Sequence, residues 1–211
     1  MTRALVLYPI DDIATSASAY VADRIANMLE DKGFEVFRFD LWKANRLLFT
    51  LQQLLNPADF IVYAGHGTLD KWFGSLTAGG IIWPLVDLLN SGMLQNKLCY
   101  AVACRTSQKL GKGAPARAYM GWKVDVYVAL PAVERNYLED LTTTFLTIPV
   151  ALAEGKTVHE ASQAYLAKCA ELKALYEANL EQWPNGDFYA MAVKNNMEGF
   201  ELLGDPYARI T

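Results

Sequence analysis

The segment Tyr63-Ala64-Gly65-His66-Gly67 decides how the rest of this sequence is interpreted. It continues the apolar, β-prone residues 59–62, so we expect a buried strand that stops where a histidine stands between two glycines. A second apolar segment, 97–103, stops in the same way before Cys104. Ligands and chemistry gather at the carboxyl ends of the strands in a parallel α/β sheet. The two segments therefore predict an imidazole beside a thiol, which is what nucleophilic cysteine catalysis requires.

Strands and helices alternate outward from this segment. The spacing of apolar residues predicts strands over 3–8, 34–39, 59–64, 97–103 and 119–129, and helices over 16–32, 42–55, 133–154 and 157–183. Other segments are expected to form a glycine-rich loop over 65–83, a short helix over 84–90, a mobile polar loop with a helical turn over 105–118, and a late strand or hairpin over 187–193 and 199–203. This alternation predicts a single α/β domain over residues 1–211, a three-layer sandwich in which helices cover both faces of a mostly parallel sheet.

Composition excludes several classes of protein. The chain has 211 residues, of which 53% are hydrophobic and 20% charged, so it is globular and long enough to bury a full core. A net charge of −4 argues against a nucleic-acid partner, and no apolar run approaches the ~18 residues of a membrane span. Three cysteines without CxxC spacing, and a start without a signal-peptide pattern, predict free thiols in the cytoplasm. With two histidines we expect no metal site, and we expect no cofactor.

Cys104 is the candidate nucleophile among the three cysteines. It stands at a predicted strand end next to Arg105, and N–H groups of the helical turn expected there would lower the pKa of its thiol. Cys99 and Cys169 are interpreted as buried, structural residues. The glycines beside His66 let the backbone turn sharply and approach a substrate closely. His66 and Cys104 are therefore predicted to act together.

Four features, in order along the chain, resemble the caspase, gingipain and clostripain clan of cysteine peptidases, and above all its gingipain-like and CHAT-domain branches. Residues 63–68 followed by Trp72 are similar to the gingipain histidine loop. Ala103-Cys104-Arg105 matches the middle of the caspase signature, although the flanking residues depart from it. Residues 155–161 resemble the opening of a late helix in the gingipain and CHAT branches, and residues 202–206 resemble their closing motif.

The resemblance implies a caspase-like fold and a cysteine endopeptidase that acts on protein or peptide substrates. Cys104 would attack the scissile carbonyl as a thiolate, and His66 would give a proton to the leaving amine. Backbone N–H groups of Gly67 and Cys104 would hold the developing oxyanion. A backbone carbonyl commonly orients the imidazole in this clan, so no third catalytic side chain is expected.

The substrate preference leaves two interpretations open. Relatives that cleave after arginine or lysine often carry aspartate two residues before the nucleophile, where this chain has Val102. Asp11 and Asp12, which follow the first strand, and Glu134, which follows the fifth, could form an acidic pocket for arginine or lysine instead. The alternative for the two aspartates is a structural one, an N-terminal cap on the first helix.

Two further residues are candidates for contact with substrate, and two further functions stay open. Arg105 could attract an acidic substrate residue, and Trp72 could wall a pocket or simply pack in the core. The chain could also be a catalytically silent caspase-like module that binds partners, although such modules usually lose the cysteine or the histidine. A flavodoxin-like protein with a small ligand in its crevice is the third possibility. The sequence does not predict the oligomeric state.

Overall fold

The computed structural model of the chain describes residues 1–76, 80–129, 135–181 and 185–210. Its main sheet has six strands: β1 (Arg3–Tyr8), β2 (Glu35–Asp40), β3 (Phe60–Ala64), β7 (Leu98–Val102), β8 (Ala118–Trp122) and β9 (Phe200–Gly204). They lie in the order β2-β1-β3-β7-β8-β9. Neighbouring strands are parallel except for β9, which runs antiparallel to β8. The sheet is therefore mostly parallel, as the alternation of elements predicts.

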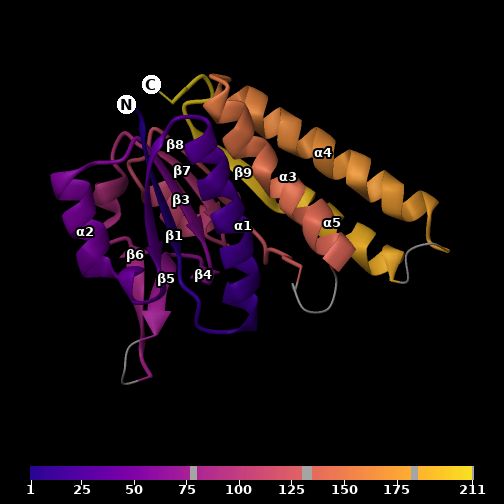
Figure 1. Cartoon of the computed structure of the whole chain (residues 1–211), viewed down its shortest axis with the longest axis horizontal. Helices are drawn as coiled ribbons and strands as arrows, with labels where there is room; N and C mark the ends of the chain where they lie inside the picture. Colours follow the sequence, from indigo (N-terminus) through magenta and orange to yellow (C-terminus); the bar gives the residue numbers. More distant parts are fainter. Residues whose placement is uncertain (77–79, 130–134, 182–184, 211) are drawn as a thin grey trace.

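Helices cover both faces of this sheet, and a small sheet completes one of them. The helices are α1 (Ile13–Asp31), α2 (Arg46–Leu55), α3 (Arg135–Ala153), α4 (Val158–Ala178) and α5 (Gly186–Gly199), with short turns η1 (Leu41–Lys43), η2 (Ser91–Leu94) and η3 (Ser107–Gly111). The small antiparallel sheet consists of β4 (Gly67–Thr68), β5 (Lys71–Leu76) and β6 (Ile82–Asp87). Helices α1, α3, α4 and α5 lie on one side of the main sheet, and α2 lies with the small sheet on the other (Figure 1). The predicted three-layer α/β sandwich is confirmed.

Each central strand contributes side chains to two cores. Val62 and Tyr100 point into the larger core, which α1, α3, α4 and α5 cover. Tyr63 and Ala101 point into the smaller core, beneath α2 and the small sheet. Because both faces are buried, these strands are apolar throughout rather than alternating with polar residues. Their continuous apolar character is the feature that made them recognisable in the sequence.

The pairing of β3 with β7 fixes where the candidate site lies. Ala64 at the end of β3 pairs with Val102 at the end of β7, in parallel register. One residue further on, the Gly65 N–H donates to the Val102 carbonyl at 3.2 Å. His66 and Cys104 therefore leave the sheet at the same edge, at the carboxyl ends of adjacent strands.

Two expectations for the segment between β3 and β7 are wrong. Residues 65–83 are not a loop throughout, because β4 and β5 form a hairpin there. Residues 84–90 do not form a helix, because the run from Ile82 to Asp87 pairs with β5 as strand β6. Pro84 is tolerated in β6 because this strand lies at the edge of the small sheet. Proline at a helix start and proline in an edge strand look alike in a sequence.

The remaining differences lie after Cys104. Residues 187–193 belong to helix α5 instead of a strand, with residues such as Tyr189 and Val193 buried in the larger core. The helical turn expected within residues 105–118 is present as η3, a π-helical turn closed by the hydrogen bond from the Gly111 N–H to the Thr106 carbonyl at 2.9 Å, and its Leu110 is buried. The fifth strand pairs only as far as Trp122. Single-turn π-helical segments often occur at functional sites.

Candidate active site

The two residues predicted to act together line one small pocket. His66 and Cys104 share a pocket of about 50 Å³ with Gly65, Val126 and Val128, among others. The pocket lies where β3 and β7 end, and the first turns of α1 close its other side through Ala14 and Ser18. An imidazole and a thiol therefore face the same cavity at the edge of the sheet.

Cys104 is the accessible cysteine of the chain. It is half-buried, and its Sγ accepts a hydrogen bond of 3.3 Å from the Val126 N–H. Burial raises the pKa of the Cys104 thiol above its ordinary value, and the bond from Val126 counteracts only part of that rise. Cys99 and Cys169 are buried in the core, where burial also raises their pKa values, that of Cys169 to about 11. Cys104 is therefore held as a neutral thiol near pH 7, but it can be reached from the solvent.

A carboxylate holds the imidazole. The Nε2 atom of His66 lies 2.6 Å from Oδ2 of Asp12, and the two side chains are 43% and 49% exposed. Burial raises the pKa of Asp12, but the hydrogen bonds from His66 and from Thr15 outweigh this effect and lower the value to about 2. Asp12 is thus ionised at neutral pH and fixes one ring nitrogen of His66. We expected no third side chain to orient the imidazole. The only sequence signal for this contact is that Asp12 is an acidic residue in the loop after the first strand.

Asp12 is also the N-terminal cap of α1. Its Oδ1 accepts a hydrogen bond of 2.7 Å from the Thr15 N–H, while Oγ1 of Thr15 accepts one of 2.9 Å from the Asp12 N–H. This reciprocal pair is a capping box, with threonine in the third helical position. The structural alternative considered for this aspartate is therefore realised, together with a contact to His66. The cap holds the carboxylate in place, and its other oxygen is directed at the imidazole.

A column of buried aromatic side chains supports the histidine loop from below. The Tyr63 hydroxyl donates to the His66 carbonyl at 2.6 Å. The Tyr63 ring stacks on Trp72, with ring centroids 4.8 Å apart and planes inclined by 4°, and the indole N–H of Trp72 donates to the Tyr119 hydroxyl at 3.0 Å. Trp72 is therefore a core residue rather than a pocket wall, because it is fully buried. It acts on the site only through the loop that it supports.

Gly67 lies against the turn that carries the thiol. A Cβ atom at this position would come within 2.4 Å of Cγ2 of Thr106 and 2.8 Å of the Cys104 carbonyl oxygen. No side chain fits there, so glycine allows the two loops to touch. This close approach is compatible with an oxyanion site formed by the N–H groups of Gly67 and Cys104, which stays a prediction.

The other residues predicted to bind substrate have partners within the chain or lie outside the described residues. Oδ1 of Asp11 accepts a hydrogen bond of 2.9 Å from the Leu76 N–H at the end of β5. The guanidinium of Arg105 pairs with Asp125 at 2.7 Å. Glu134 lies outside the described residues. The structure therefore brings Asp12, His66 and Cys104 together, and the two described aspartates of the predicted acidic pocket bind the Leu76 N–H and His66.

A larger polar hollow is lined by Arg105, the residue after Cys104, together with residues that sequence reasoning missed. Its volume is about 490 Å³, and its lining includes Arg105, Gln108, Lys123, Asp125 and Asn195. One wall is the extended segment 123–127, which follows β8 and passes beside Cys104. The hollow is large enough for a substrate side chain. Apart from Arg105, no motif marks these residues, because they come from three separate parts of the chain.

Helix α5 holds this extended segment through two asparagines. Asn196 is fully buried, and its side-chain amide accepts from the Tyr127 N–H at 2.9 Å and donates to the Tyr127 carbonyl at 2.8 Å. Asn195 donates to the Asp125 carbonyl at 2.7 Å. The amide of Asn196 thus satisfies both backbone groups of Tyr127, as a neighbouring strand would. This places the Val126 N–H against the sulfur of Cys104.

The part of the chain that the structure describes offers neither a metal site nor a membrane-spanning helix. Within residues 1–76, 80–129, 135–181 and 185–210, histidine, cysteine, aspartate and glutamate nowhere gather in a group of three that could hold a metal ion. In the same residues no helix has the length and apolar character needed to cross a membrane.

The fold and the position of the pocket define a caspase-like α/β sandwich. Its arrangement is similar to that of gingipain R, RgpB, an Arg-specific cysteine proteinase: the TM-score is 0.61 at 16% identity, over 99% of this chain and 47% of that one. A complex of the Porphyromonas gingivalis RgpB pro- and mature domains matches with a TM-score of 0.61 and 14% identity, over 99% and 48% of the two chains. A third structure, described as a protease, matches with 0.58 and 13%, over 99% and 48%.

These likenesses confirm the predicted resemblance at the level of the fold. The chain spans about half the length of the solved structures that it matches. No family model matches the sequence, and no curated protein matches it.

Proposed function

We propose that this chain is a cysteine peptidase in which Cys104 is the nucleophile, His66 the proton carrier and Asp12 the residue that orients His66. One observation carries the proposal: His66 and Cys104 line the same pocket at the ends of adjacent parallel strands, and an ionised carboxylate lies 2.6 Å from the imidazole. A nucleophile, a base and a group that orients the base are the three parts of an activated nucleophilic site. The gingipain-like fold supports the same assignment.

The proposed reaction has two steps. The Cys104 thiol loses its proton to His66, its sulfur forms a bond to the scissile carbonyl carbon, and the C–N bond breaks as His66 gives the proton to the leaving amine. Water then loses a proton to His66 and attacks the thioester carbon, and the sulfur leaves and regains the proton. Because the resting thiol is neutral, His66 becomes positively charged only when it takes the proton from Cys104. The negative charge of Asp12 would stabilise this protonated form of His66. The N–H groups of Gly67 and Cys104 would stabilise the oxyanion in both steps.

Covalent labelling with peptidyl electrophiles tests this proposal. We expect a chloromethyl ketone or acyloxymethyl ketone panel to add one adduct to the intact chain, detected by mass spectrometry, and the adduct to map to Cys104. Cys104→Ala should abolish the adduct, whereas Cys99→Ala should keep it, since the Cys99 thiol is buried. His66→Ala should slow labelling without removing the thiol. An adduct that persists in Cys104→Ala would refute the assignment.

A second candidate function is the catalytically silent binding module. It would be favoured if Cys104 reacts with small iodoacetamide at an ordinary rate while no peptidyl electrophile in the panel labels it. The thiol is only half-buried, so a small reagent such as iodoacetamide can reach it whether or not a substrate site is present. The ratio of the two labelling rates therefore separates a substrate-binding site from a merely exposed cysteine.

A preference for arginine or lysine before the scissile bond is a finer part of the proposal. The contacts of Asp11 and Asp12 argue against a pocket built from these two carboxylates, because Asp11 binds a backbone N–H and Asp12 binds His66. The support that is left is the likeness to gingipain R, an Arg-specific proteinase. A fluorogenic peptide library decides the matter, and arginine and lysine substrates that are cleaved no faster than leucine substrates would remove this part of the proposal.

A further inference from the structure

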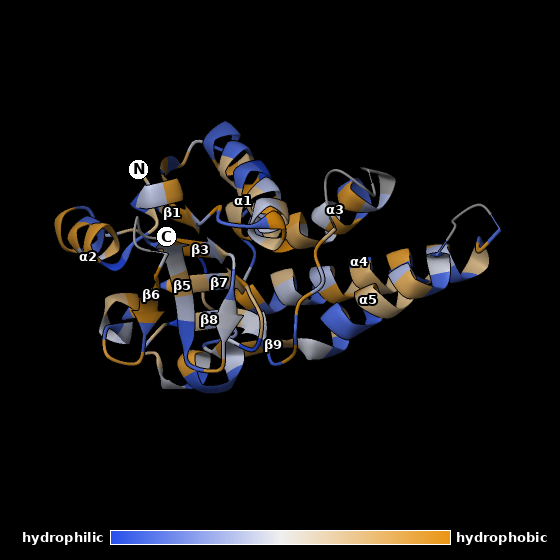
Figure 2. Cartoon of the chain, turned by 90° about the horizontal axis from the view of Figure 1, so that it is seen from below, coloured by the Kyte–Doolittle hydropathy of each residue, from blue (hydrophilic) through white to orange (hydrophobic). Residues whose placement is uncertain are grey.

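Helix α2 presents its apolar side to the solvent. Leu47, Leu51, Leu54 and Leu55 are 67%, 42%, 63% and 73% exposed, and we call these four residues the outer face of α2. Their spacing along the helix places them on one side, the pattern by which a surface helix normally faces a core. Figure 2 shows α2 at the margin of the molecule, coloured mostly hydrophobic.

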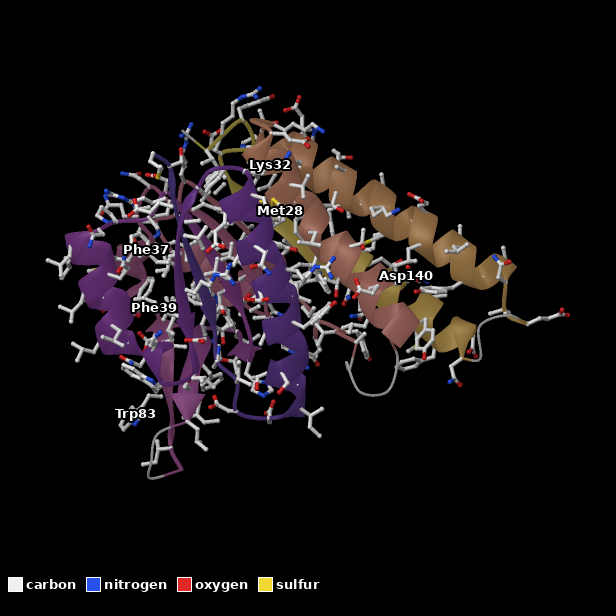
Figure 3. The ribbon with its side chains drawn as sticks, in the orientation of Figure 1. Met28, Lys32, Phe37, Phe39, Trp83 and Asp140 are labelled. Atoms are coloured by element: carbon white, nitrogen blue, oxygen red, sulfur yellow. The ribbon has the colours of Figure 1, made fainter. Side chains whose placement is uncertain are left out.

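The inner side of α2 is not apolar throughout. Phe49 packs into the smaller core, against which Phe37 and Phe39 of β2 also pack (Figure 3). Gln53 also points inward, where it is 7% exposed, and neither its side-chain nitrogen nor its oxygen has a hydrogen-bond partner among the described residues. A buried amide without partners is destabilising, whereas the leucines outside would gain from burial. The leucine stripe is therefore placed to meet another surface.

Two further exposed side chains, both tryptophans, belong to segments that lie next to the start of α2. Trp42, in η1, is 70% exposed and Trp83, in β6, is 60% exposed. The chain segments are joined, because the Arg46 guanidinium donates to the carbonyl of Pro84 and pairs with Asp87. Trp83 lies beside the lower end of α2 and is directed away from the main sheet (Figure 3).

The area of this surface is comparable to one side of a stable dimer. If a fully exposed leucine side chain is taken as roughly 150 Å² and a tryptophan as roughly 250 Å², the six side chains expose roughly 700 Å². The largest apolar patch on a typical monomer is ~300–600 Å², and a standard interface buries ~800 Å² per partner. Counted together, the six side chains thus expose more apolar area than the largest patch of a typical monomer.

We propose that the outer face of α2 joins two copies of this chain in a two-fold symmetric dimer, helix against helix. In such a contact a residue near the axis meets its own copy, so a charge there would repel itself. Helix α2 carries one charged side chain, Arg46, and Asp87 neutralises it. Leucines at this spacing form ridges that fit the grooves of an identical helix. A membrane surface is a poorer match, because helices that lie on membranes are usually rich in lysine and arginine on their polar side.

Sedimentation velocity on the full chain tests the proposal. We expect the wild-type protein to sediment as a dimer at ~50 µM, which lies above the micromolar to picomolar dissociation constants of standard-sized interfaces. Leu51→Glu should raise the dissociation constant at least ~100-fold, because it places two carboxylates together in an apolar contact. Leu175→Glu is the matched control: Leu175 is 46% exposed, lies in α4 and should leave the dimer intact.

Cross-linking tests the symmetry. Leu51→Cys in the Cys104→Ser background should give a disulfide-linked dimer on mild oxidation, whereas Leu175→Cys in the same background should not. A wild-type protein that stays monomeric at this concentration would overturn the proposal and leave the surface to a different partner. A dimer that persists in Leu51→Glu would equally overturn it, since another surface would then be responsible. Circular dichroism shows that all variants are folded, and labelling of Cys104 adds a second check for Leu51→Glu and Leu175→Glu, which keep this cysteine.

Discussion

Replacing Asp12 by asparagine separates the two contacts of this residue. Asparagine caps helices about as well as aspartate, so the bond to the Thr15 N–H and the stability of α1 should be kept to within ~0.5 kcal/mol. The negative charge beside His66 is lost, however. A hydrogen bond to a charged group is worth ~1.5–3 kcal/mol, and since both side chains are more than 40% exposed, solvent screening reduces this to ~1–1.5 kcal/mol. We therefore expect a rate ~5–10-fold below that of the wild type.

The assay is the second-order rate constant for labelling of Cys104 by a peptidyl electrophile, followed by intact mass. Asp12→Ala is the companion variant, and it should show the same loss of rate together with a loss of ~1 kcal/mol in unfolding free energy from the missing cap. If Asp12→Asn reacts as fast as the wild type while Asp12→Ala is merely less stable, then Asp12 is a cap alone. The idea that it orients His66 would then be wrong.

The pH dependence of stability provides a separate check on Asp12. Its pKa in the folded protein is about 2, below the ordinary value of 3.8, so the ionised form is favoured by folding. The stabilisation is therefore fully present above about pH 4 and is lost as the pH falls toward 2. We expect the difference in unfolding free energy between wild type and Asp12→Ala to shrink over this interval, measured by urea denaturation. A difference that stays constant between pH 5 and pH 2 would contradict the lowered pKa.

Three further predictions concern the surroundings of the thiol. The alkylation rate of Cys104 should keep rising at pH values above those at which ordinary thiols have ionised, because burial raises its pKa; a plateau near pH 8 would contradict this. Gly67→Ala should cost ~1–3 kcal/mol and slow labelling, whereas Gly92→Ala, where a Cβ meets nothing within 4 Å, should do neither in thermal unfolding and labelling assays. Asn196→Ala should lower the unfolding free energy by ~2 kcal/mol and slow labelling of Cys104, since it leaves the Tyr127 backbone groups without partners. An unchanged labelling rate would show that the contact between Asn196 and Tyr127 does not affect the thiol.

The main sheet could be predicted from the sequence because its strands are buried on both faces. An unbroken apolar run such as 60–64 has few other structures available to it, and its end marks the place where polar chemistry begins. His66 and Cys104 were found by this logic alone, as the residues that stand directly after two such runs. The pairing of their strands follows from the parallel order of the sheet.

The rest of the site depends on contacts between distant segments. Nothing near Asn196 in the sequence indicates that its amide binds the backbone of Tyr127, because α5 reaches that segment only through the packing of α4 and α5 on the sheet. The same holds for Trp72, whose indole is fixed by Tyr119, a residue of β8. Asp12 was identified as a candidate from the sequence. The sequence did not indicate that its carboxylate both caps α1 and binds His66.

Asn195 and Asn196 connect the helix pair α4 and α5 to the backbone segment that contacts the sulfur of Cys104. In Figure 1 these two helices extend well beyond the main sheet, so their far ends lie at a distance from it. At the near end, Asn195 and Asn196 hold Asp125 and Tyr127, and the residue between those two donates its N–H to the sulfur of Cys104. A small rotation or slide of α5 at the sheet would therefore move the backbone N–H that donates to the sulfur of Cys104. A partner that binds the far end of α4 and α5 would therefore be able to change the reactivity of Cys104.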